Sequence, residues 1–385
     1  MEGRAHSPMY FCVMSMLDTI PEAIEAIRRG EVIIVVDDED RENEGDFLIA
    51  ARHATPEVVN FMATHGRGLI CAPLVEKRCD DLDLALMVQT NNAAFETPFT
   101  VSVDLMGHGC TTGISAQDRS KTIQALIDPK TDPNELGRPG HIFPLRARAG
   151  GVLRRAGHTE AAIDFSRLAG FEPAGVIVEI MNEDGTMARL PECRKLANEH
   201  GLKLVSIEDL IQYRLANETL IERTLELDIE TAFGQFKAIT YRQLTNDTEH
   251  LALTLGEWTE DDDVPVRVHS TSMLGDVFQM TNFGKGPELH AAMKQIQKQG
   301  KGAVVYINKL REGQSVTDEL KIYKEKQAAP NTKESNTMDS KDYGIGAQII
   351  RDLGIRRLHI LSDHPRKKGI IGYGLEITGT TPLSV

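Results

Sequence analysis

Hydrophobic positions along the chain alternate between helical spacing and short unbroken apolar runs. Residues 20–27 carry apolar side chains at helical spacing, and Thr19 and Glu22 stand three positions apart, as in a capping box. Gly30 follows, and residues 32–36 then form an unbroken run of valine and isoleucine. Such a run is typical of a strand buried on both faces of a sheet, so the pattern predicts a helix followed by a central strand.

The same alternation continues towards the C-terminus. It predicts strands at residues 47–51, 69–72, 176–180, 264–268, 303–307 and 358–361, and helices at residues 56–66, 121–127, 191–201, 287–299 and 343–353. Strands interleaved with helices favour an α+β fold with α/β layers over a helical bundle. In addition, the charged residues 206–227 are predicted to be helical, and the lysine-rich residues 311–341 to form a long mobile loop.

Length and composition narrow the class of protein. The chain has 385 residues, and a domain size of roughly 100 to 200 residues predicts two domains. The formal net charge of -14 argues against nucleic-acid and membrane-surface partners, which recruit an excess of lysine and arginine. We expect the short apolar stretch at residues 9–17 to belong to an N-terminal extension and not to a signal peptide. The five cysteines form no Cys-x-x-Cys pair, so we expect a reducing, cytoplasmic compartment.

The strongest chemical signal is the acidic segment DDEDRENEGD at residues 37–46. One interpretation is a solvated acidic loop, as for most charge runs. The alternative is a metal site, because the segment directly follows the predicted buried strand, and ligands gather at the carboxyl ends of strands in α/β sheets. Magnesium takes one or two protein carboxylates together with water and substrate oxygens. The position of the segment therefore favours a metal site.

Other residues could complete such a site, although each also has a purely structural interpretation. His158 lies in RRAGHTE, where Arg155 can pair with a phosphate through its forked donors. His141, beside a Pro-Gly pair, could act as a general acid or base. Glu179 interrupts an apolar run and either lies on an exposed strand face or accepts a proton. Residues 111–115, TTGIS, could hold a phosphate through backbone N–H groups.

Four segments, in this order and spacing, resemble 3,4-dihydroxy-2-butanone-4-phosphate synthase over roughly residues 17–215. They are VVDDEDRENEGDFLIAA, TTGISAQDRSKTI, RPGHIFPLRARAGGVLRRAGHTEAAIDFSRLAG and PAGVIVEIMNEDGTMARL. The resemblance implies conversion of D-ribulose 5-phosphate to 3,4-dihydroxy-2-butanone 4-phosphate and formate in riboflavin biosynthesis. It also implies a homodimer that uses magnesium or manganese, often as two ions.

The resemblance assigns roles to residues by motif. It implies that Glu42 and His158 are metal ligands. It implies that His141 and Glu179 are catalytic residues. The substrate-binding positions that it implies are Arg41, Glu42, Asp46, Thr112, Arg155, Ala156, Gly157, His158 and Thr159. Such chemistry needs a Lewis acid for an enediolate and a group that takes and returns protons, but which residue moves which proton stays open.

The C-terminal half resembles GTP cyclohydrolase II through RVHS, GDVF, DYGIGAQIIRDLGI and GYGLEI. That family holds zinc with three cysteines, whereas the matching positions here are Ser272, Phe283 and Lys285. No cysteine follows Cys193, and Lys341 replaces the arginine of the family's catalytic pair, whose planar guanidinium a lysine does not reproduce. We therefore expect no zinc and no GTP hydrolysis in this half.

Two alternatives stay open for the whole chain. One is a bifunctional enzyme that retains cyclohydrolase activity through a different metal arrangement. The other is a non-catalytic nucleotide-binding or scaffolding protein, which the intact set of candidate catalytic and metal-binding residues argues against. The missing thiolates favour a lyase with an inactive second half, organised as an extension at residues 1–16 and domains at residues 17–215 and 216–385.

Overall fold

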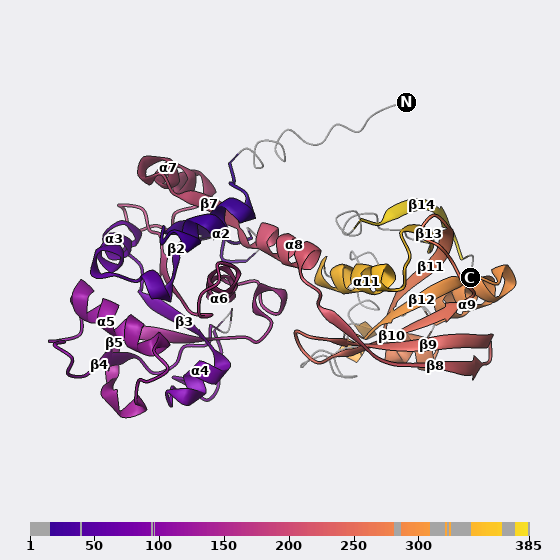
Figure 1. Ribbon diagram of the computed structural model, residues 1–385, viewed down its shortest axis with the longest axis horizontal. Coiled ribbons are helices and arrows are strands. Elements are labelled where there is room, and N and C mark those ends of the chain that lie inside the picture. The colour runs from indigo at the N-terminus through magenta and orange to yellow at the C-terminus, as the bar shows by residue number, and fades with distance from the viewer. Residues whose placement is uncertain are drawn as a thin grey trace. The chain divides into compact units, whose positions relative to one another are not determined.

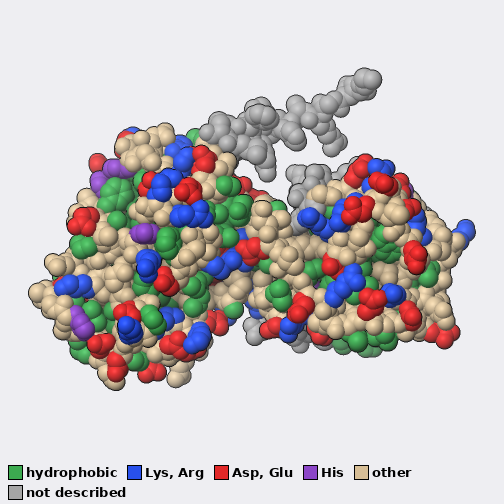
Figure 2. All heavy atoms as spheres, viewed as in Figure 1, with side chains coloured by type: hydrophobic (Ala, Val, Ile, Leu, Met, Phe, Trp, Pro, Cys, Tyr) green, Lys and Arg blue, Asp and Glu red, His purple; other side chains and the backbone are tan. Residues whose placement is uncertain are grey.

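The structure is a computed structural model, and the residues that it describes are 16–38, 41–93, 95, 97–280, 286–308, 320–321, 323–324, 340–363 and 374–383. The chain divides into two compact units, Met1–Tyr213 and Arg214–Val385, and each unit has its own sheet (Figure 1). On the face shown in Figure 2, basic and acidic side chains intermingle over both units. None of the described helices is long and apolar enough to cross a membrane.

The first unit is built on a seven-stranded mixed sheet in the order β4-β5-β3-β6-β2-β1-β7. Its strands are β1 (Ile33–Val36), β2 (Gly45–Ala50), β3 (Cys71–Val75), β4 (Val103–Leu105), β5 (Leu136–Ala147), β6 (Gly175–Glu179) and β7 (Lys203–Ser206). Its helices are α2 (Ile20–Arg28), α3 (Pro56–Gly66), α4 (Glu76–Asp81), α5 (Ala116–Ile127), α6 (His158–Leu168) and α7 (Leu190–His200), and α8 (Ile207–Asn217) spans the division between the units. β1 pairs antiparallel with β2, so the acidic segment that connects them lies at the end of β1 and the start of β2, on one side of the sheet where these strands terminate.

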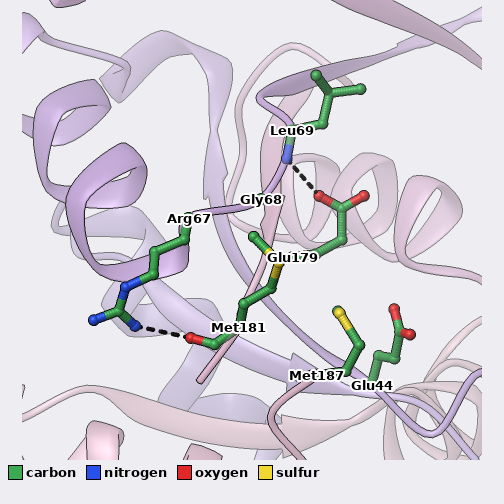
Figure 3. A pocket seen from close by; sticks show the side chains of 7 residues that line it. All are labelled: Glu44, Arg67, Gly68, Leu69, Glu179, Met181 and Met187. Carbon is green, nitrogen blue, oxygen red and sulfur yellow. Dashed lines mark hydrogen bonds between the residues drawn. The ribbon is translucent and has the colours of Figure 1, made fainter. Parts of the chain in front are cut away.

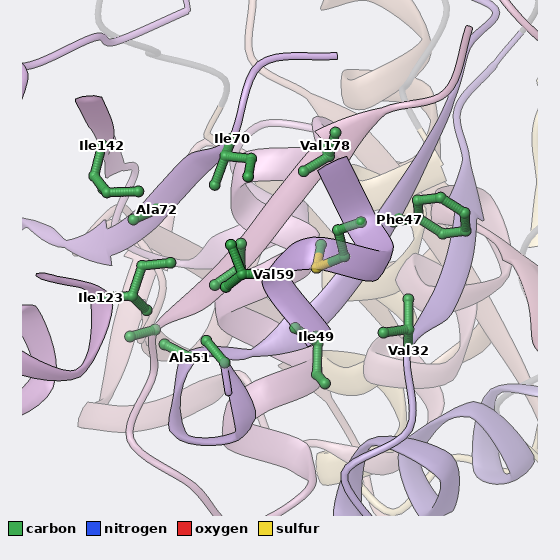
Figure 4. Close-up of a cluster of buried hydrophobic side chains, with 14 of the residues drawn as sticks. Val32, Phe47, Ile49, Ala51, Val59, Ile70, Ala72, Ile123, Ile142 and Val178 are labelled. Atoms are coloured by element: carbon green, nitrogen blue, oxygen red, sulfur yellow. The ribbon is translucent and has the colours of Figure 1, made fainter. Parts of the chain in front are cut away.

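Apolar side chains on the sheet form the core of the first unit, which supports the strands next to the acidic segment. All four residues of β1 are buried, as the valine and isoleucine run predicts. Phe47, Ile49 and Val178 are 0% exposed and pack in one cluster with Val59 of α3 and Ile123 of α5 (Figure 4). Full burial of such a side chain contributes about 1.5–3 kcal/mol. The cluster therefore holds β2 and β6 firmly, and both strands carry candidate site residues.

Local signals set the helix ends. Thr19 and Glu22 make both hydrogen bonds of the predicted capping box at the start of α2. The Thr55 side chain accepts a hydrogen bond at the start of α3, where Pro56 follows. Gly201 ends α7 in the left-handed region, at a φ of 67°.

The second unit is built on another seven-stranded sheet, in the order β14-β13-β11-β12-β10-β9-β8. Its strands are β8 (Ile221–Thr231), β9 (Gly234–Gln243), β10 (Glu249–Leu255), β11 (Asp263–Ser270), β12 (Gly302–Ile307), β13 (Arg357–Leu361) and β14 (Glu376–Thr381). Its helices include α9 (Gly286–Gln299) and α11 (Ser340–Asp352). Ala292 and Ile296 of α9 pack against Val304 of β12, and all three are 0% exposed.

The predicted layered α+β architecture is confirmed in both units. One assignment is wrong, because residues 206–227 are not a single helix: α8 ends at Asn217, and β8 begins at Ile221. Hydrogen bonding and side-chain pairing between β8 and β9 outweigh the local helix propensity of this stretch. Most of residues 311–341, predicted to form a mobile loop, lie outside the described residues.

A polar contact between the buried Tyr241 and the partly exposed Asp352 joins α11 to the sheet of the second unit. The Tyr241 side chain is 0% exposed, and its hydroxyl donates to Oδ2 of Asp352 at 2.8 Å. Nε of Arg223 donates to the same oxygen at 2.6 Å. The indole N–H of Trp258 donates to the carbonyl of the adjacent Leu353 at 2.9 Å. Asp352 therefore ties β8 and β9 to the end of α11.

Replacing Asp352 by alanine is expected to destabilise the second unit by about 1–3 kcal/mol, because the Tyr241 hydroxyl is left buried without its acceptor. Trp258 is the only tryptophan in the chain, so its fluorescence during urea unfolding reports this unit. The exposed Asp261 provides a matched control, and Asp261→Ala should change the stability by less than about 0.5 kcal/mol. Identical unfolding curves for the two variants would show that the contact contributes nothing.

Candidate active site

The loop between β1 and β2 folds around one buried carboxylate. The Asp37 side chain is 0% exposed and pairs with Nη1 of Arg41 at 2.6 Å. The same carboxylate accepts the backbone N–H groups of Glu42 at 3.2 Å and Glu44 at 2.9 Å. These bonds offset part of the repulsion among the acidic side chains and fix the backbone at Glu42.

His158, the first residue of α6, lies beneath this loop and is 5% exposed. Its Nε2 lies 3.1 Å from the carbonyl oxygen of Val35 in β1. A carbonyl can only accept, so Nε2 carries a proton, and Nδ1 is the nitrogen that faces the carboxylates and could bind a cation in place of a proton. That nitrogen lies 3.8 Å from Oε2 of Glu42 and 3.9 Å from Oδ1 of Asp46. A histidine whose second nitrogen donates to a backbone carbonyl is the usual arrangement at a metal site.

The donors around Nδ1 fit a divalent cation. Asp37, Glu42 and His158 each offer one ligand atom, and these atoms all lie within 4.8 Å of one another. Two octahedral ligands, each about 2.1 Å from one magnesium ion, lie about 3.0 Å apart when adjacent and about 4.2 Å apart when opposite. The separation of 3.8 Å between Oε2 of Glu42 and Nδ1 of His158 lies between these two distances and is too long for a hydrogen bond. Asp37 thus adds a third donor, and a second oxygen, to the two predicted ligands.

The electrostatics of the cluster also call for positive charge. Burial raises the pKa of Asp46 far above its usual range, and the neighbouring Glu179 and Glu42 carboxylates add to the shift. The pKa of His158 is raised as well: burial alone would lower it, but the charges of Asp46 and Glu42 outweigh that effect. Burial, with Glu42 beside it, also raises the pKa of Glu44. A cation bound among these groups would relieve the excess negative charge.

Glu179 ends β6 beside the cluster, because it pairs with Asp46 in the register of β2 and β6. Its Oε2 accepts the backbone N–H of Leu69 at 2.8 Å (Figure 3). At Gly68 an added Cβ would lie 2.6 Å from that oxygen, so a larger residue does not fit. A pocket opens here, lined by Glu44, Arg67, Gly68, Leu69, Glu179, Met181 and Met187. The Glu179 carboxylate borders this pocket.

The turn before α6 is held by a second buried carboxylate. Glu160 is 0% exposed and accepts the backbone N–H of Arg148 at 3.0 Å. It also pairs with Nη1 of Arg155 at 2.7 Å. One side of the Arg155 guanidinium is therefore occupied, and Glu160 fixes the path of residues 155–159.

Two predicted site residues lie elsewhere in the same chain. His141 is in β5, and Thr112 is exposed in the segment that precedes α5. β3 and β6 lie between β5 and β2, which separates the two strand axes by roughly 14 Å. His141 instead contacts Asp104 of β4, with Nδ1 at 2.6 Å from Oδ2. The structure thus brings together the cluster at the β1–β2 loop and leaves His141 and Thr112 at the β4–β5 edge.

Four residues near the candidate site residues were not predicted individually from the sequence: Asp37, Glu44, Arg67 and Asp104. Asp37 and Glu44 stand inside the acidic segment, so their spacing from Glu42 was the available signal. Arg67 and Asp104 carry no local signal, because their contacts come from distant parts of the chain. Asp104 stands 37 positions from His141, and Arg67 stands 114 positions from Met181, whose carbonyl accepts its Nη1 at 2.8 Å.

In the second unit, only one of the three positions matched to zinc cysteines is described. The Ser272 hydroxyl accepts the backbone N–H of Gly275 at 3.1 Å and begins the turn Met273–Val277. Asp276 in that turn lies 2.9 Å from Nε2 of the buried His269. Phe283, Lys285 and the side chain of Lys341 lie outside the described part of the chain.

Comparison with known proteins assigns a family to each unit. Residues 21–213 match the family of 3,4-dihydroxy-2-butanone 4-phosphate synthase, and residues 222–382 match GTP cyclohydrolase II. The riboflavin biosynthesis protein RibBA of Cytophaga hutchinsonii is 56% identical over 375 residues, which cover 96% of this chain and 93% of that protein. RibBA of Bacillus subtilis is 51% identical over 378 residues, which cover 96% and 94%.

A solved structure matches across both units. It is RibBX of A. baumannii, described as a two domain 3,4-dihydroxy-2-butanone 4-phosphate synthase. It is 40% identical, covers 94% of this chain and 99% of its own, and has a TM-score of 0.77. The predicted enzyme class is thereby confirmed: the first unit is a 3,4-dihydroxy-2-butanone 4-phosphate synthase, and the chain serves riboflavin biosynthesis.

The comparisons contradict the prediction of an inactive C-terminal half. That half matches the GTP cyclohydrolase II family over residues 222–382, and proteins named RibBA are 51–56% identical across both halves. The bifunctional alternative is therefore better supported than the inactive one. The chain belongs to the family of riboflavin biosynthesis proteins in which a 3,4-dihydroxy-2-butanone 4-phosphate synthase unit precedes a GTP cyclohydrolase II-type unit.

Proposed function

We propose that Glu42 and His158 hold the divalent cation, magnesium or manganese, with which residues 17–215 convert D-ribulose 5-phosphate to 3,4-dihydroxy-2-butanone 4-phosphate and formate. The observation that carries this proposal is the 3.8 Å separation of Glu42 Oε2 from Nδ1 of His158, the ring nitrogen that faces away from the Val35 carbonyl. When bound, the cation supplies Lewis acidity to nearby substrate oxygens. The carboxylate of Asp37 stands within reach as a further ligand.

The other groups of this cluster bind substrate and move protons. Arg41 stands beside the predicted ligand Glu42 and can pair with an oxygen anion of the substrate. Residues 155–159 form the turn into α6, which begins at His158. Backbone N–H groups at the start of this helix favour the binding of an anion such as the substrate phosphate. Glu179 borders the pocket next to Asp46 and is placed to take and return a proton.

A homodimer accounts for the distance between His141 and the cluster. Five large apolar side chains in segments next to β4 and β5 are at least 48% exposed: Leu86, Met87, Val88, Met106 and Ile114. A second copy that covers this edge would bury them. It would also bring His141 and Thr112 of the partner subunit to the metal cluster, which completes the predicted set of residues.

Replacing Glu42 by alanine is expected to lower formate release from ribulose 5-phosphate more than about 10²-fold, because a metal ligand is lost. The variant should stay folded, since the substitution removes one of several mutually repelling charges. Calorimetric titration with magnesium or manganese should show weaker binding. Glu199→Ala, on the exposed side of α7, is the matched control and should keep full activity. Full activity of Glu42→Ala would refute the metal assignment.

A mixing experiment tests the dimer. Chains with Glu42→Ala and chains with His141→Ala should each be inactive alone. After subunit exchange in equal amounts, half of the dimers are mixed and each has one intact site, so about one quarter of the wild-type activity should return. A mixture that stays inactive, although exchange is verified with tagged chains, would show that His141 acts within its own chain.

A second function, at residues 216–385, is favoured by the match to GTP cyclohydrolase II and by the identity to RibBA proteins over the whole chain. We propose that this domain acts on GTP. No cysteine follows Cys193, so a metal there would be held by oxygen and nitrogen ligands.

The test uses the full chain with Glu42→Ala, which leaves the second domain as the source of formate. This variant should release formate from GTP with magnesium, manganese or zinc, and a chelator should stop the release. Absence of formate with each of the three metals, in a preparation whose second unit unfolds like the wild type by Trp258 fluorescence, would refute the proposal.

A further inference from the structure

The Asp104 carboxylate holds His141 at two points. Its Oδ1 accepts the backbone N–H of His141 at 2.8 Å, and its Oδ2 lies 2.6 Å from Nδ1 of the ring. The side chain of Asp104 is 19% exposed, whereas that of His141 is 45% exposed. One carboxylate thus fixes both the main chain and the ring of an otherwise accessible histidine.

The backbone around Asp104 keeps the carboxylate in this position. The pairing of β4 with β5 shifts register between Val103 and Asp104. At Gly140 the strands approach so closely that an added Cβ would lie 2.0 Å from the carbonyl carbon of Val103. At Gly113, where φ is +88°, an added Cβ would lie 2.0 Å from Oδ2 of Asp104. Gly140 therefore admits the backbone at Val103 and Asp104, and Gly113 admits the Asp104 carboxylate and leaves it little room to turn.

The contact decides which ring nitrogen carries the proton. A carboxylate oxygen accepts, so the hydrogen bond at 2.6 Å requires a proton on Nδ1 of His141. In the neutral ring, Nε2 then has the lone pair and can accept a proton from a substrate. In the opposite tautomer, Nδ1 and the carboxylate would place two lone pairs against each other.

We propose that Asp104 is a positioning residue that holds His141 in the Nδ1–H tautomer and so makes Nε2 the proton-accepting atom. The inference rests on the proposed role of His141 in proton transfer, and Asp104 acts only through His141. It also places this proton-accepting nitrogen at the β4–β5 edge. Thr112 is close by, because the next residue, Gly113, lies against the Asp104 carboxylate.

Kinetics of Asp104→Asn provide the first test. The asparagine amide can donate to Nδ1 and favours the wrong tautomer, so kcat for formate release should fall about 10²-fold with KM nearly unchanged. Asp104→Glu keeps a carboxylate and should recover at least about one tenth of the wild-type kcat. The matched control is Glu135→Gln, which alters the exposed pair of His108 Nε2 and Glu135, 2.9 Å apart, and should leave kcat unchanged.

The tautomer itself provides a second test, which does not depend on activity. Proton–nitrogen correlation spectra of the ¹⁵N-histidine protein, assigned with His141→Ala, should show Nδ1–H in the wild type and Nε2–H in Asp104→Asn. A wild-type kcat in Asp104→Asn would overturn the inference, and so would a lost activity with an unchanged tautomer. If His141→Ala kept full activity, the proposed role of His141 would fail; an inactive His141→Ala beside a fully active Asp104→Asn would overturn only the role of Asp104.

Discussion

The hydrogen bond from Nε2 of His158 to the Val35 carbonyl is the contact on which the geometry of the metal cluster depends. It holds Nε2 at the main chain and directs Nδ1 towards Glu42 and Asp46. Val35 lies in β1, which is fully buried and paired on both sides by β2 and β7. The orientation of a predicted ligand is therefore set by the main chain of a central strand, although its partners come from a loop.

The carboxylates of the acidic loop have different surroundings, and this difference lets the loop fold in spite of their like charge. Asp37 is satisfied by backbone N–H groups and by Arg41, and Arg41 also pairs with Glu42, which faces His158 on its other side. Asp46 is buried, and its raised pKa reflects a site that favours neutral or cation-bound forms. The repulsion among the carboxylates is thus partly offset by these hydrogen bonds and ion pairs, and the remaining negative charge favours the binding of a cation.

Much of the fold could be predicted from the sequence where apolar spacing and capping residues agree, as for α2, β1 and α3. β5 gave no such pattern, since its sequence LGRPGHIFPLRA contains glycine and proline and its burial does not alternate. The cluster of candidate metal ligands could be predicted because Glu42 and Asp46 stand in one acidic segment and His158 in a recognisable motif. The contacts of Asp104 and Arg67 were not, since they depend on strand pairing across the sheet.

The pairing of β2 with β6 places Asp46 opposite Glu179. Side chains alternate between the two faces of a strand, so the insertion or deletion of a single residue in either strand would turn one carboxylate away from its neighbour. A change in chain length is therefore expected to be tolerated in exposed connections such as residues 128–132 and not in β2 or β6. The length of these two short strands is thus a condition for keeping the two candidate site carboxylates side by side.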